Sequence, residues 1–170
     1  MNDITIAPAR TGHLAALREI ELAAFETLRA AGAVSGEPAA SSLEDLEQLS
    51  HEGLLLVALT ADQQPVGFAG AQIVDNWLHI AEMDVHPAWQ RKGIGRQLLQ
   101  ALLSAGERRG LAGASLTTDR YAPFNAAFYA SLGFEPIKEE ALSPRLKNLI
   151  AAEAASGLDA KRRMAMQRPY

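Results

Sequence analysis

The chain has 170 residues, of which 48% are hydrophobic and 21% charged, and this fits one compact domain covering 1–170. It contains no cysteine, which excludes disulfides, thiolate metal sites and a catalytic cysteine, and its net charge of -4 argues against nucleic acid as a main partner. Met1 to Ile6 lack the features of a signal peptide, and the longest strongly apolar run, Leu54–Leu59, is too short to cross a bilayer. We therefore expect a cytoplasmic protein without a membrane partner.

Apolar periodicity and turn-forming residues predict an alternation of strands and helices with no internal repeat and no long linker. In its first part, the sequence predicts a strand at 4–10, a helix at 14–28 with Thr11 as its N-cap, a loop or broken helix at 29–42, and a helix opened by a capping box of Ser42 and Asp45. Strands at 54–60, 66–74 and 77–85 follow. The last part is predicted to contain a helix at 93–109, a strand at 114–118, a helix at 123–132, a strand at 134–137, a helix at 142–155 and a strand at 163–167. Short links join the three middle strands, which predicts an antiparallel meander.

The segment between the strand at 77–85 and the next helix is a candidate anion site. Gly93 and Gly95 keep the start of the helix free of side chains, so a ligand can approach backbone N–H groups that have no partner within the helix. These groups lie at the positive end of the helix dipole, and Arg91, Lys92 and Arg96 add positive charge. The segment therefore predicts a site for a pyrophosphate.

Two other phosphate-binding classes fit less well. A P-loop requires G-x-x-x-x-G-K-[ST], which the chain lacks. A Rossmann fold places its glycines after the first strand, whereas here they follow the fourth.

The segment Gln90-Arg91-Lys92-Gly93-Ile94-Gly95 resembles the [QR]-x-x-G-x-[GA] signature of the GNAT superfamily of acetyl-CoA-dependent N-acetyltransferases, and the Val-His-Pro before it is also typical of that family. The predicted order of elements resembles the family's fold across nearly the whole chain. The resemblance implies an α/β (α+β) fold with a central mixed, mostly antiparallel sheet of six to seven strands and helices on both faces. It also implies acetyl-CoA as co-substrate, bound between the fourth and fifth strands, and no metal. The residues it assigns to acetyl-CoA are Met83, Asp84, Val85, Gln90, Arg91, Lys92, Gly93, Ile94, Gly95, Arg96 and Asn125.

A second motif lies around Tyr129. Phe124, Phe128 and Leu132 are spaced as one apolar helix stripe, Gly133 is placed to end the helix, and Tyr129 lies about 100° away from the stripe. The stretch resembles the family's F-Y-x-x-x-G-F motif, whose tyrosine protonates the leaving CoA thiolate. Many relatives have an asparagine seven residues before this tyrosine, where this chain has Ala122, so Asn125 is the substitute expected to contact CoA.

The strand at 77–85 supplies the candidates for a catalytic base. Strict alternation places His79, Ala81 and Met83 on one face and Glu82 and Asp84 on the other. Some relatives use His or Glu at the position of His79, so His79 is the first candidate base. Glu82 is held in reserve, because a bulge in the strand would change the faces. A backbone N–H near Met83 to Val85 is expected to hold the thioester oxygen.

The expected reaction is direct attack of a primary amine on acetyl-CoA without a covalent acyl-enzyme. A small-molecule amine is favoured as acceptor. Its pocket is expected to be formed by the region from about Arg29 to Ser42, with His79 and the segment Leu142–Ala155 as further contributors. A protein lysine or N-terminal acetyltransferase, and a non-catalytic acyl-CoA-binding module, remain open as alternatives, as does a homodimer.

Overall fold

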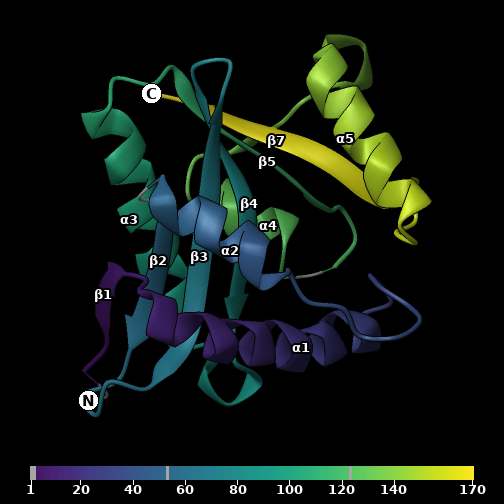
Figure 1. Cartoon of the computed structure of the whole chain (residues 1–170). Helices are drawn as coiled ribbons and strands as arrows, with labels where there is room; N and C mark the ends of the chain where they lie inside the picture. The colour runs from purple at the N-terminus through teal and green to yellow at the C-terminus, as the bar shows by residue number, and fades with distance from the viewer. Residues whose placement is uncertain (1–2, 53, 123) are drawn as a thin grey trace.

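The computed structural model describes residues 3–52, 54–122 and 124–170. Seven strands form one sheet in the order β1-β2-β3-β4-β5-β7-β6, with helices on both faces (Figure 1). The elements are β1 (Thr5–Pro8), α1 (Leu14–Ala30), α2 (Leu43–His51), β2 (Leu55–Leu59), β3 (Pro65–Val74), β4 (Trp77–Val85), α3 (Ile94–Arg108), β5 (Gly113–Asp119), α4 (Ala126–Ala130), β6 (Glu135–Pro136), α5 (Pro144–Ala155) and β7 (Arg163–Pro169). Their arrangement confirms the predicted fold class.

Two apolar clusters hold the helices to the sheet. On one face α1 and α2 bury leucines such as Leu17 and Leu46 against Phe68 of β3. On the other face α3 buries Leu98 and Leu102 against the sheet, and α4 packs at the margin of that cluster. Both layers are visible in Figure 1. In the part of the chain that the structure describes, no helix is long and apolar enough to cross a membrane.

Two helix predictions require correction. Thr11 does not cap α1, because the chain first makes a 3-10 turn at Thr11–His13 that is capped by Arg10. Helix α4 spans Ala126–Ala130, shorter than the predicted 123–132; Phe124 lies in the turn before it, and Pro123 lies outside the described residues. The predicted capping box of α2 is confirmed, with the Asp45 N–H donating to Ser42 Oγ at 3.1 Å.

Strands β4 and β5 separate over part of their length. They pair in parallel at three positions, the last being His79 with Ser115. Beyond that pair, β4 continues to Val85 on its β3 partner, while β5 continues to Asp119 on β7. Main-chain groups of β4 after His79 are therefore not paired with β5, and the sheet is open at this point.

A β-bulge at Ala81 reverses the side-chain faces of β4. Gly70 pairs with Glu82 and Ala71 with Ile80, so Ala81 is left without an opposite residue. Leu78 and Ile80 lie in the cluster beneath α3, and after the bulge Met83 and Val85 pack against that same cluster. The predicted face assignment is therefore wrong: Glu82 and Asp84 lie on the face of His79 and α1, and Met83 lies opposite.

Candidate active site

The turn before α3 has the geometry of an anion site. Gly93 is the N-cap of α3 with φ of 80°, and Arg91 also has a positive φ, of 64°. The side-chain amide of Gln90 donates to the carbonyl of Val85 at 3.0 Å, which ties the turn to the end of β4. The turn therefore exposes the first N–H groups of a 15-residue helix beside the opening between β4 and β5.

The two glycines of this turn differ in their surroundings. A Cβ at Gly93 would meet nothing within 4 Å, so Gly93 is required for its left-handed backbone. A Cβ at Gly95 would lie 3.7 Å from the Phe128 ring and 4.0 Å from Met83 Cε, so a longer side chain would enter the space between α3 and α4.

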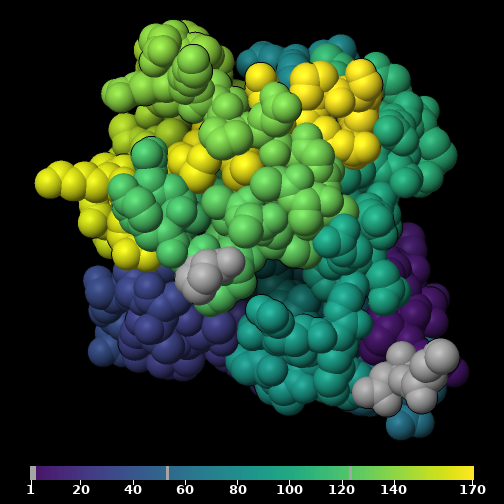
Figure 2. Space-filling view, turned by 180° about the vertical axis from the view of Figure 1, so that it is seen from behind, coloured from purple at the N-terminus to yellow at the C-terminus, as the bar shows by residue number. Residues whose placement is uncertain are grey.

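Two of the cations of the turn, Lys92 and Arg96, contact neighbouring side chains. Arg96 donates to Ser131 Oγ at 2.9 Å, which links the start of α3 to the end of α4, and Lys92 Nζ lies 4.7 Å from the Trp89 ring centroid. Figure 2 shows a hollow on this face, bordered by the teal segment that contains the turn and by the green segment that contains α4. A pyrophosphate at the turn and an acyl chain in the opening would therefore be adjacent.

Tyr129 lies beside this opening on α4. Its ring packs edge-on against Phe128 and Phe134, with centroids 5.2 and 6.0 Å away. Burial, and then the nearby carboxyl groups of Asp84 and Glu82, raise the pKa of Tyr129, so its hydroxyl stays protonated at neutral pH. Asn125, one turn earlier, is half-buried, and its carbonyl accepts the Tyr129 N–H at 3.1 Å.

His79 lies deeper in the sheet, where β4 and β5 are still paired. It is 6% exposed, and its Nδ1 lies 3.0 Å from Ser115 Oγ. Burial, and then the charge of Arg145, lower the pKa of His79 to about 4, so the ring is neutral at pH 7.

Glu82 and Asp84 lie nearer the opening and face Glu21 of α1. The three carboxyl groups have oxygens within 4.8 Å of one another. Burial, and then the charge of Glu21, raise the pKa of Glu82 to about 7. Burial, and then Glu82, raise the pKa of Asp84 well above its ordinary value. A carboxyl group with a pKa near 7 is suited to accept a proton at neutral pH.

Glu21 was not among the residues predicted from sequence. It follows the buried Ile20 and lies four residues after the buried Leu17, a spacing that points it toward the sheet. It accepts hydrogen bonds from Ser41, at 2.8 Å from the N–H and 3.2 Å from Oγ. Glu21 therefore joins α1, the loop before α2 and the carboxyl pair of β4.

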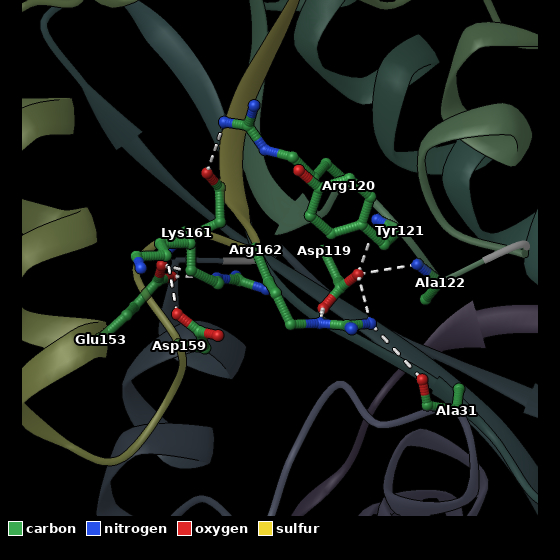
Figure 3. Close-up of polar contacts among 10 residues, drawn as sticks. Ala31, Asp119, Arg120, Tyr121, Ala122, Glu153, Asp159, Lys161 and Arg162 are labelled. Carbon is green, nitrogen blue, oxygen red and sulfur yellow. Dashed lines mark hydrogen bonds and ion pairs between the residues drawn. The ribbon is translucent and has the colours of Figure 1, made fainter.

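An ion pair between Asp119 and Arg162 fixes the far end of α1 to the sheet (Figure 3). Arg162 donates to both oxygens of Asp119, at 2.7 and 3.1 Å, and also to the carbonyl of Ala31 at 3.4 Å. Asp119, 1% exposed at the end of β5, also accepts the N–H groups of Tyr121 and Ala122. Burial acts to raise the pKa of Asp119, but these hydrogen bonds outweigh it and hold that pKa below its ordinary value.

Comparison with known proteins identifies the family. A model of the acetyltransferase (GNAT) family matches residues 14–134, and the chain belongs to this family. The [ribosomal protein bS18]-alanine N-acetyltransferase of Salmonella typhimurium is 36% identical over 83 residues, which cover 49% of this chain and 56% of the relative. The Escherichia coli enzyme of the same name is 35% identical over the same length. The chain thus spans about half the length of the curated relatives it matches.

Solved structures share the fold over nearly the whole chain. The PaiA N-acetyltransferase of Thermoplasma acidophilum, in complex with coenzyme A, gives a TM-score of 0.73 at 20% identity and covers 99% of both chains. The ribosomal-protein-S18-alanine N-acetyltransferase of E. coli gives 0.69 at 22% identity, covering 98% of this chain and 94% of that one.

Proposed function

We propose that the protein transfers an acetyl group from acetyl-CoA to a primary amine by direct attack. The observation that carries this proposal is the opening of β4 from β5 after His79, with the α3 turn at one end and Tyr129, Glu82 and Asp84 around it. The unpaired edge of β4 suits the pantetheine arm, whose amide groups can bond to it as an added strand would. The turn from Gln90 to Arg96 suits the pyrophosphate.

Glu82 is the base that the geometry favours over His79. Its pKa of about 7 lets it take a proton from the amine at neutral pH, whereas His79 is bonded to Ser115 and has a pKa near 4. As the new N–C bond forms and the C–S bond breaks, Tyr129 donates its proton to the sulfur, so the products are the acetylated amine and CoA. A main-chain N–H near Met83 to Val85 would hold the thioester oxygen.

The experiment is a panel of amines scored by release of CoA thiol. Because the chain has no cysteine, a thiol reagent reports CoA without background from the protein. The panel includes alkyl amines, diamines, amino acids, a lysine peptide and a peptide beginning with alanine. We expect release with at least one amine, and loss of release in Tyr129→Phe. Tight acetyl-CoA binding with no release from any member would instead favour an acyl-CoA-binding module.

The second candidate acceptor is the N-terminal amine of a protein. The names of the curated relatives favour it, and the alanine peptide of the panel tests it directly. A cytoplasmic location and a homodimer remain predictions.

A further inference from the structure

The carboxyl cluster of Glu21, Glu82 and Asp84 differs from the other acids of its face in its direct contacts with cations. Two other carboxylates on the same face each have an arginine: Asp119 has Arg162 at 2.7 Å, and Glu153 of α5 has Arg163 at 3.0 Å. Among the residues that the structure describes, none of the three cluster members forms an ion pair. Against burial, which raises both pKa values, the charge of Arg18 acts to lower the pKa of Glu21, and that of Arg163 acts to lower the pKa of Glu82, but in the described residues neither arginine is in ion-pair contact with the cluster.

One atom of the cluster has no hydrogen-bond partner. Asp84 Oδ2 is shielded from solvent and, within the described ranges, accepts no hydrogen bond. A buried polar atom in this state is costly, and such atoms in folded proteins are almost always paired with protein, water or a ligand. A donor supplied from outside the chain would satisfy it.

The position of the cluster favours an ammonium group as its ligand. An ammonium has three N–H donors, which suit three carboxyl groups whose oxygens lie within 4.8 Å of one another. Glu82 and Asp84 lie on the part of β4 that is not paired with β5, so an amine held there would be beside the opening proposed for the thioester. Because the same spacing would admit a divalent cation, a metal titration distinguishes the two ligands.

We propose that Glu21, Glu82 and Asp84 bind the acceptor as its ammonium ion, and so select alkyl amines that are cations, against amines that carry a carboxylate on the same short chain. This inference rests on the proposed function and names its substrate class. The bound ammonium donates to the three carboxyl groups and passes one proton to Glu82. The neutral amine that results is the nucleophile.

Direct binding tests the site without catalysis. The full chain, saturated with CoA so that no acetyl group is present, is titrated calorimetrically with n-pentylamine and with 5-aminopentanoate. We expect pentylamine to bind at least about tenfold more tightly, because the second probe brings a negative charge to an acidic site. Equal affinities, or no binding of pentylamine, would overturn the proposal.

Matched variants assign the binding to the cluster. Glu21→Gln removes one charge and should weaken pentylamine binding roughly tenfold, with CoA affinity unchanged. Glu19→Gln makes the same change on the exposed side of α1 and should have no effect. Ser41→Ala removes the hydroxyl that donates to Glu21 but keeps the carboxylate, so amine affinity should stay within about twofold. If Glu21→Gln leaves the affinity for pentylamine unchanged, or if Ser41→Ala lowers that affinity as much as Glu21→Gln does, then Glu21 only holds the loop before α2 and the proposal is overturned.

A metal titration tests whether the cluster binds a metal ion instead of an ammonium, and an assay of CoA release separates this proposal from the proposed function. If Mg²⁺ or Mn²⁺ binds in competition with pentylamine and that binding is lost in Glu21→Gln, the cluster is assigned to a metal ion and the proposal is overturned. The proposed function fails separately: amines that bind at the cluster without CoA release refute the transferase and leave the site standing. If CoA is released but the KM for the amine does not change in Glu21→Gln, the transferase activity stands and the ammonium site is refuted.

Discussion

At the scale of single residues, Tyr129 offers the cleanest separation of chemistry from binding. Its ring packs edge-on between Phe128 and Phe134, and phenylalanine keeps that packing. Tyr129→Phe should lower kcat about 100-fold by removing the proton donor, with the Kd for acetyl-CoA unchanged. Steady-state kinetics measures kcat, and calorimetry measures the Kd for acetyl-CoA. A variant with full kcat would exclude Tyr129 as the acid.

Glu82 should set the pH dependence of the reaction. Besides burial, its pKa of about 7 reflects Glu21 of α1 and Glu153 of α5, which raise it, and Asp84 and Arg163, which lower it. A base must be deprotonated to act, so kcat/KM should rise as the pH increases through about 7. Glu82→Gln should lose this rise together with about 100-fold in rate. Should His79→Gln remove the rise instead, His79 would be the base.

The same carboxyl group should cost stability at high pH. Glu82 holds its proton more tightly in the folded protein, with a pKa of about 7, than in the unfolded chain, where 4.5 is the ordinary value. Its contribution to stability is therefore complete below pH 4.5 and lost as the pH rises through 7. At pH 8, Glu82→Gln should melt a few degrees above the wild type, and at pH 4 the difference should vanish. Thermal melts at the two pH values measure it.

At the scale of elements, the turn before α3 can be tested with two matched glycines. Gly93 and Gly110 both have positive φ, 80° and 69°, and a Cβ at either would meet nothing within 4 Å. Alanine should therefore destabilise each variant by a similar amount, about 1 kcal/mol. Gly93→Ala alone should weaken CoA binding, by tenfold or more, because Gly93, unlike Gly110, begins the helix whose first N–H groups are proposed to bind the pyrophosphate. Equal CoA affinity in the two variants would remove the turn from the binding site.

At the scale of the whole molecule, Arg162 connects the two halves of the site. It joins Ala31 at the end of α1 to Asp119 at the end of β5, next to the segment that leads to α4 (Figure 3). Arg162→Gln should release the loop after α1, lower the melting temperature and raise the KM for the amine more than that for acetyl-CoA. Arg120→Gln, which removes an exposed arginine with a single bond to the Arg163 carbonyl, should change neither constant. Equal effects of Arg162→Gln on both constants would exclude a specific role at the acceptor side.

The fold was predictable from the sequence because its signals are local. The meander of β2 to β4, the capping box of α2 and the Gly-rich start of α3 each depend on neighbouring residues. The carboxyl cluster was not predictable in the same way, because Glu21 and Glu82 are sixty-one positions apart and meet only after α1 packs on the sheet. One signal was present in the strand itself: the apolar residues Leu78, Ile80, Met83 and Val85 have spacings of two, three and two, which strict alternation cannot produce.

Ala81, the bulge residue, makes β4 sensitive to a change in its length. Shortening the strand by removing Ala81 would restore regular alternation and carry Glu82 and Asp84 around to the leucines beneath α3, with Met83 and Val85 turned toward Glu21. Deletion of this small, exposed residue should therefore unfold the protein, whereas Ala81→Ser, which keeps the length of the strand, should leave the melting temperature nearly unchanged. A relative that lacks this residue would need a different set of groups at this position, so under the proposed function the length of the strand would help to select the acceptor.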